Sequence, residues 1–308
     1  MTSTQVGHVF EMNNQDIQEL KKAILILEAP SLMVRMSNVL GTPIEKGMEK
    51  LPNDWQESIG DVVELSLNKA MEAALLTMSD NEQQISSDWL HKGMAVASGA
   101  AGGVFGLSGL LFELPITTAI ILRSITDIAR SEGEDIHSPE VAMSCMEVFA
   151  LGSPKTKSDD AAEASYYAIR AALGKVVADS ATYLATKTSQ VATSKLVNKQ
   201  SAPVLVRFIE KIAERFGITV TSKAAAQFVP VIGAIAGASI NAIFINHYQD
   251  MARGHFVVLR LERTYGENAV KLKYEELRSE KKSLSIKKPR SKKIEIHFAQ
   301  VKSRRFLG

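Results

Sequence analysis

The residues best suited to chemistry in this 308-residue chain gather in the run NHYQDMARGHF, near its far end. His247, Asp250 and His255 can each bind a metal or exchange a proton, and Arg253 adds a fixed positive charge. On a helix Asp250 shares a face with His247, whereas His255 lies eight residues after His247, beyond Gly254. The HExxH pattern of a helical zinc site is absent, so we expect no metal and no cofactor here.

Two interpretations of this run remain open. If the four side chains line a pocket, they suit a hydrolase-type enzyme or a small-ligand site; otherwise they form a polar cluster at a helix end. Asp250-Met-Ala-Arg253 repeats an earlier sequence, Asp127-Ile-Ala-Arg130, and both follow an apolar run. A carboxylate beside an apolar core is costly unless it is paired. We therefore expect Arg123, Asp127, Asp250 and Arg253 to be partly buried and bonded to neighbouring helices. The full candidate polar cluster is Arg123, Asp127, Asn241, His247, Asp250, Arg253, His255, Arg260, Glu262 and Arg263.

Known catalytic and phosphate-binding patterns are absent from the chain. The glycine-rich run GAAGGVFGLSG has neither the P-loop lysine nor a preceding strand, and no G-x-S-x-G occurs. The single cysteine, Cys145, lies among apolar residues, where a thiol is inert. One cysteine excludes an internal disulfide and fits a reducing compartment. We name no catalytic residue and favour a protein that is not an enzyme.

Two apolar stretches must position these polar residues. Gly93–Leu122 contains one ionisable residue, Glu113, and Ala224–Asn246 contains none. Each could form a buried hairpin in a helical bundle, insert reversibly into a membrane, or span it; we favour the buried hairpin. Pro115 predicts a break into two half-helices in the first stretch. Small residues let helix backbones approach closely, so we expect close packing at Gly99, Gly102, Gly103, Gly106, Gly233 and Gly237.

The remaining sequence is typical of polar or amphipathic helices. Cap signals recur at Asn14, Ser138-Pro139 and Thr221, and Gly217 predicts the end of a helix. Only Ile294–Val301 shows strand-like alternation. We predict an all-α multi-helix bundle of roughly nine or ten helices, built around the two Gly/Ala-rich stretches. The expected divisions are an arm over residues 1–12, a helical domain over 13–266 and a flexible basic tail over 267–308.

Charge is distributed unevenly along the chain. From Lys271 onward there are thirteen Lys and Arg against four Glu, a balance of +9, so the remainder carries −7. A basic tail on an acidic body predicts an anionic partner. We expect anionic membrane, reached through the tail Lys271–Arg305 and the apolar centre, rather than nucleic acid; a protein partner is a further expectation. No signal peptide is visible, so we predict a cytoplasmic protein at the inner face of the membrane.

The sequence resembles the EcsC family over about residues 25–266. The resemblance depends mainly on PVIGAIAG, starting at Pro230, on Asp250-Met-Ala-Arg253 and on GHFVVLRLERTYG. This bacterial family is named after a protein encoded beside ABC transporter components. The resemblance implies a membrane-associated helical accessory protein linked to transport or secretion, and it implies no catalytic residues.

Overall fold

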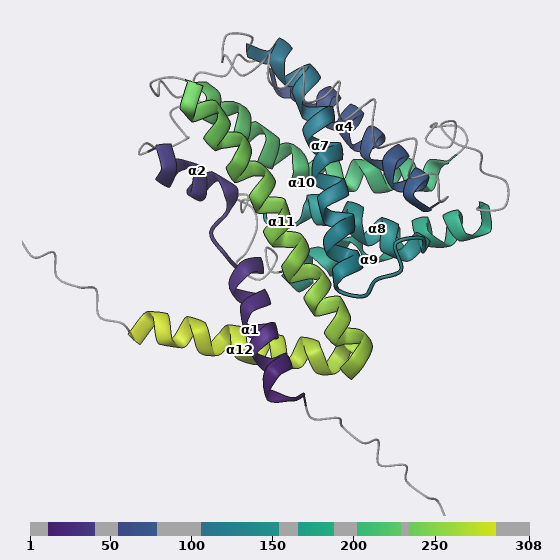
Figure 1. Ribbon diagram of the computed structural model, residues 1–308, viewed down its shortest axis with the longest axis vertical. Helices are drawn as coiled ribbons and strands as arrows, with labels where there is room; N and C mark the ends of the chain where they lie inside the picture. Colours follow the sequence, from purple (N-terminus) through teal and green to yellow (C-terminus); the bar gives the residue numbers. More distant parts are fainter. Residues whose placement is uncertain are drawn as a thin grey trace, which may run out of the picture.

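A helix of 32 residues, α11 (Ala234–Tyr265), crosses the molecule diagonally in Figure 1 and contacts helices on all sides. Its inner face repeats every three or four residues, through Phe244, Tyr248, Met251, His255 and Val258, and each of these side chains is buried. This spacing keeps one stripe of a helix facing its neighbours over many turns. The stripe is not purely apolar, because it includes a histidine and a tyrosine.

The computed structural model describes residues 12–40, 55–78, 106–153, 166–187, 202–228 and 234–287, and within these ranges every regular element is a helix. The predicted all-α multi-helix class is confirmed. Besides α11, the elements are α1 (Asn14–Leu27), α2 (Leu32–Leu40), α4 (Trp55–Met78), α7 (Gly106–Ser131), α8 (Pro139–Glu147), the 3-10 turn η1 (Val148–Ala150), α9 (Tyr166–Lys187), α10 (Pro203–Phe228) and α12 (Glu267–Lys287).

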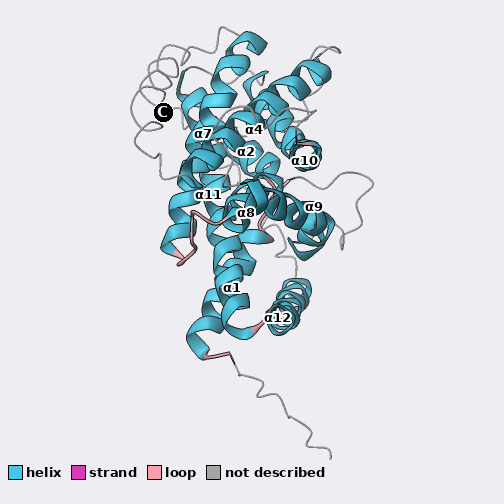
Figure 2. Ribbon diagram, turned by 90° about the vertical axis from the view of Figure 1, so that its right-hand side faces the viewer, coloured by secondary structure: helices cyan, strands magenta, loops and turns pink. Residues whose placement is uncertain are grey.

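The helices pack on α11 in two groups. At the upper end in Figure 1, α7 lies between α11 and α4, while α10 contacts both α4 and α9. At the lower end, α1 runs beside α11 and α12 crosses below, as Figure 2 shows from the side. Four buried rings pack together where η1, α10 and α11 meet, with centroid separations from 5.2 to 6.2 Å: Phe149, Phe216, Phe244 and Tyr248.

Local signals set several helix ends. The Asn13 side chain accepts a hydrogen bond from the Asp16 backbone amide and caps α1, one residue before the cap expected at Asn14. Ser138 caps α8 as predicted, with Pro139 at the first helical position. Gly266 has a φ of +87° immediately after α11, a left-handed conformation that ends a helix at little cost only for glycine.

Two predicted interruptions are wrong. Pro115 lies inside the continuous helix α7, and Gly217 lies inside α10. The Thr221 hydroxyl bonds to the Gly217 carbonyl at 2.8 Å, so Thr221 is a helix-interior residue rather than a cap. Both helices are held by buried neighbours, including Leu114 and Phe216, which are fully enclosed. Packing outweighs a helix propensity cost of about 1 kcal/mol for a single glycine.

The two apolar stretches are only partly within the described residues. The second is divided between the end of α10 and the start of α11, and residues 229–233 between them lie outside the described ranges. Gly106 begins α7 and Gly237 lies near the start of α11, while the other four glycines predicted to pack closely lie outside the described ranges. Among the helices that the structure describes, none is long and apolar enough to cross a membrane.

The predicted flexible tail does not begin at residue 267. Residues 267–287 form α12, and Val270, Tyr274 and Leu277 on this helix are buried. The folded part therefore continues past Gly266. Residues 271–280 carry equal numbers of basic and acidic groups, so the whole +9 balance falls on residues 281–308. The strand-like run Ile294–Val301 and the arm over residues 1–11 lie outside the described ranges.

Candidate functional site

The polar residues predicted on α11 do not converge on one site. His247 and His255 are buried, Asp250 is partly exposed and Arg253 is exposed. His255 and Glu262 belong to an interior network, whereas Arg260 and Arg263 join a surface ion cluster. No group of three His, Cys, Asp or Glu in the described part of the chain is arranged to hold a metal ion.

The interior network is the most elaborate polar arrangement among the described residues. Its centre is the Glu262 carboxylate of α11, whose Oε1 accepts hydrogen bonds from the Arg170 guanidinium and the Tyr167 hydroxyl, both at 2.8 Å. The side chains of Arg170 and Glu262 are only 18% and 9% exposed. A charge-assisted bond in such surroundings fixes α9 against α11. We call this set the tyrosine–carboxylate network: Glu28, Glu147, Tyr166, Tyr167, Arg170, His255, Glu262, Tyr274 and Arg278.

His255 and Glu147 form the deepest part of the network. The Tyr166 hydroxyl lies 2.9 Å from Nδ1 of His255, while Nε2 lies 4.0 Å from a Glu147 carboxylate oxygen. Burial, reinforced by the nearby Arg170 charge, lowers the pKa of His255 well below its ordinary 6.5, so the ring is neutral. Burial raises the pKa of Glu147 to about 7, with Arg170 opposing the rise and Glu262 adding to it. This carboxyl can therefore bind a proton at neutral pH.

Three tyrosine rings connect this centre to α1 and α12. Tyr274 stacks on Tyr166 at a centroid distance of 5.7 Å and meets Tyr167 edge-on at 5.0 Å. Its hydroxyl donates to Glu28, the residue directly after α1, at 3.1 Å. Burial raises the pKa of all three hydroxyls, which therefore stay protonated. The network joins α8, α9, α11, α12 and the C-terminal end of α1 through neutral donors and paired charges, and both Glu147 and His255 are shielded from solvent. Its contacts hold these helices against one another, and its deepest groups lie away from solvent.

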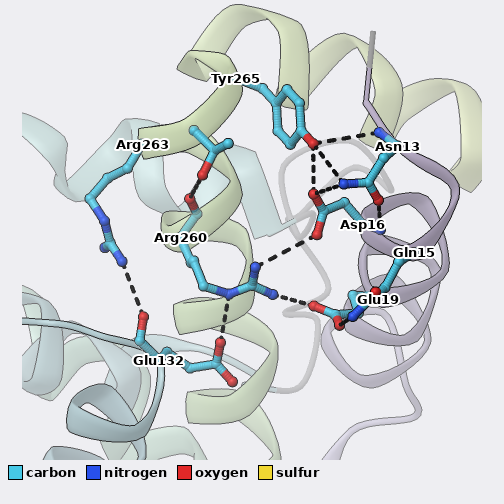
Figure 3. Close-up of polar contacts among 9 residues, drawn as sticks. Asn13, Gln15, Asp16, Glu19, Glu132, Arg260, Arg263 and Tyr265 are labelled. Atoms are coloured by element: carbon cyan, nitrogen blue, oxygen red, sulfur yellow. Dashed lines mark hydrogen bonds and ion pairs between the residues drawn. The ribbon is translucent and has the colours of Figure 1, made fainter. Parts of the chain in front are cut away.

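A second cluster lies on the surface, centred on Arg260 (Figure 3). Its guanidinium forms ion pairs with two carboxylates of α1, Glu19 and Asp16, the latter at 3.7 Å. It also donates a hydrogen bond at 2.9 Å to Glu132, which directly follows α7. Arg263 of α11 forms an ion pair with Glu134, two residues after Glu132. The Arg260 side chain is about one-third exposed, so each pair is worth little alone, but the shared arginine ties α1 and α7 to α11.

The predicted brace of four charges is wrong except at Asp250. Asp250 pairs with Arg35 of α2 at 3.0 Å and with Arg253 at 3.2 Å. Asp127 pairs with Arg130 within α7, and both side chains are more than half exposed. Arg123 is also exposed. The repeated D-x-A-R sequence has a different common feature, because its alanines, Ala129 and Ala252, are completely buried. The repeat presents a small residue to the core and leaves Asp127, Arg130 and Arg253 exposed, with Asp250 partly buried.

The His247 ring is buried and packs closely against the backbone at Gly152. Burial and the positive Arg35 lower its pKa to about 4, with Asp250 and the Gly152 backbone acting in the opposite direction. Neither ring nitrogen has a hydrogen-bond partner among the described residues. A Cβ on Gly152 would lie 2.5 Å from the ring Cε1 atom, and Gly152 has a φ of +68°. Only glycine fits this position without strain.

Replacing Gly152 with alanine is expected to reduce the free energy of unfolding by about 1–3 kcal/mol, because the left-handed backbone and the His247 contact both oppose a side chain. Urea unfolding followed by circular dichroism measures the loss. Gly174→Ala is the matched control, since Gly174 is exposed within α9 and a Cβ there meets nothing within 4 Å. The control should be neutral or stabilising by up to about 1 kcal/mol. Equal effects of the two variants would contradict the proposed fit of Gly152.

A buried ion pair was missed by sequence reasoning. Lys223 of α10 donates to Glu113 of α7 at 2.7 Å, and its side chain is completely buried. The signal was available, because Glu113 is the sole ionisable residue of the first apolar stretch and Lys223 directly precedes the second. Asn241, predicted as part of the polar cluster, lies on α11 with its buried Oδ1 lacking a partner in the described ranges.

Comparison with known proteins agrees with the sequence resemblance. No curated protein and no solved structure matches the chain. The EcsC protein family matches residues 15–261, a segment that begins within α1 and ends within α11. This match includes Arg260 and its partners on α1 and after α7, but not Arg263. The chain belongs to the EcsC protein family.

Proposed function

We propose that this protein is a non-enzymatic accessory protein that associates peripherally with anionic membrane at its cytoplasmic face, in a process linked to transport or secretion. The observation that carries the proposal is the separation of charge. Ten Lys and Arg against one Glu fall on residues 281–308, while the preceding residues are acidic overall. Juxtamembrane basic segments are attracted to anionic leaflets by roughly 1 kcal/mol per basic residue, an attraction that salt weakens.

The interior chemistry supports the same proposal. The polar groups best able to transfer a proton, Glu147 and His255, are enclosed by other side chains. The groups on the surface of α11, such as Arg260, are already paired with carboxylates of neighbouring elements. The link to transport or secretion comes from the family resemblance alone.

Flotation with liposomes tests the membrane proposal. The intact chain should float with vesicles containing anionic lipid at low salt and should be released at high salt. A chain ending at Lys287 keeps all of α12 but loses seven basic residues and one acidic residue. We expect its binding at low salt to fall by at least about tenfold.

A full-length variant in which those seven Lys and Arg are changed to Gln is the matched control for chain length. It should lose as much binding as the truncated chain, because the proposal assigns the attraction to charge. Equal binding of all three proteins, or no flotation of the intact chain at low salt, would overturn the proposal.

A further inference from the structure

The Lys223–Glu113 ion pair is unusual for its degree of enclosure. The Lys223 side chain is 0% exposed and that of Glu113 is 13% exposed. The ammonium group lies 2.7 Å from the Glu113 carboxylate and 4.6 Å from the centre of the Phe244 ring. A face of an aromatic ring attracts a cation. The lysine therefore contacts α7 through its charge partner and α11 through this ring.

The position of the pair in the sequence matches its position in the fold. Glu113 lies in the first apolar stretch, Lys223 directly precedes the second, and Phe244 lies near the end of the second. The three residues belong to α7, α10 and α11 respectively. The pair therefore joins the two apolar stretches where they meet in the described part of the molecule.

Separating the Lys223 and Glu113 charges inside the folded protein would cost a large free energy. A buried charge that loses its partner keeps its desolvation cost without the compensating attraction. Burial already lowers the pKa of Lys223, and the Glu113 carboxylate acts in the opposite direction. The nearby Thr117 hydroxyl lies 3.5 Å from Glu113, a long contact that cannot replace the ammonium. The apolar stretches can part only when both charges reach a polar environment.

We propose that the Lys223–Glu113 pair is a closing device, which holds together the parts of the two apolar stretches that lie in α7, α10 and α11, and prevents their insertion into membrane until both charges reach the polar lipid interface. This inference rests on the proposed membrane function, in which the basic segment brings the protein to the surface. The anionic attraction and the apolar insertion are then separate steps, with the ion pair controlling the second.

Binding to uncharged phosphatidylcholine vesicles isolates the second step, because the basic segment has no anionic partner there. The test compares the intact chain with Lys223→Met, Glu113→Gln and the exchanged pair Glu113→Lys/Lys223→Glu. Each single variant should bind these vesicles at least about fivefold more than the unchanged protein. The exchanged pair should return toward the unchanged level. Lys211→Met, which breaks an exposed pair with Glu214 on α10, is the matched control and should change nothing.

The outcomes separate the two proposals. Folded single variants that bind uncharged vesicles no better than the unchanged protein overturn the closing device, whatever happens on anionic vesicles. Failure of the unchanged protein to bind anionic vesicles overturns the proposed function instead. If the single variants do not fold, hydrogen exchange of the unchanged protein decides. Anionic vesicles should then speed amide exchange around residues 113 and 223, and unchanged exchange there overturns the device.

Discussion

Arg170→Met is expected to lower the free energy of unfolding by about 3–5 kcal/mol, because it leaves the buried Glu262 carboxylate without its cationic partner. Arg170 donates to Glu262 at 2.8 Å, and the Glu262 side chain is only 9% exposed. Methionine keeps much of the apolar stem of arginine, so the loss reports mainly on charge. Chemical unfolding at neutral pH, with the transition followed by circular dichroism, gives the difference.

A double variant distinguishes a broken pair from poor packing. Arg170→Met combined with Glu262→Leu removes both charges and should recover most of the lost stability, since an apolar replacement of a buried pair is often neutral. Lys211→Met is the surface control and should cost at most about 1 kcal/mol, because Lys211 and Glu214 are both more than half exposed. A double variant as unstable as Arg170→Met would show that the pair's charges are not the cause.

The overall architecture follows from signals that are local in sequence. Apolar residues at helical spacing and caps such as Ser138 give the class and most helix ends. The errors at Pro115 and Gly217 also have a local origin, since each residue disfavours a helix by itself. Both sit in helices whose flanking side chains are buried against α4 and other neighbours. Tertiary packing outweighs local propensity there, and that packing cannot be inferred from a short window.

The interior network could be predicted only in part. His255 and Glu262 are found because α11 is rich in polar residues, but their partners come from distant segments, at Glu147, Tyr166 and Arg170. Glu147 lies in the apolar run MSCMEVFAL, where a lone carboxylate is easily taken for a solvent-facing residue. Its burial depends on how α8 meets α9 and α11. The partners of a charge on one helix are set by three-dimensional packing, which periodicity does not specify.

The C-terminal end of the folded part shows a limit of prediction from composition. Residues 267–287 have many charges, and on composition they suit a solvated tail. Three of them, Val270, Tyr274 and Leu277, nevertheless recur at helical spacing and are buried. Tyr274 also bonds to Glu28, which caps the end of α1 and lies 246 residues away in the sequence. A narrow apolar stripe is sufficient to pack α12 on the rest of the protein when a hydrogen-bond acceptor is already in place. The net charge of a segment does not reveal such a stripe.

The pKa of Glu147 predicts how stability changes with pH. Burial raises this pKa from an ordinary 4.5 to about 7, so the folded protein holds a proton that the unfolded chain has lost between these values. The contribution of Glu147 to the free energy of unfolding is therefore fully present below about pH 4.5. It is lost as the pH rises through 7, and the total loss is about 3 kcal/mol. The buried histidines act in the opposite direction. His247, whose pKa is lowered to about 4, and His255 stabilise the fold above pH 6.5, and this contribution is lost as the pH falls.

Comparing Glu147→Gln with the unchanged protein separates the pH effect of the Glu147 carboxyl from that of the histidines, because His247 and His255 are present in both. The glutamine variant should gain stability relative to the unchanged protein by about 3 kcal/mol as the pH rises from 4.5 to 8. Urea unfolding at several pH values across this range measures the difference. Glu210→Gln, at an exposed position on α10, controls for the loss of one negative charge. A difference between Glu147→Gln and the unchanged protein that is the same at both ends of the range would mean that Glu147 is not the proton-binding group of the network.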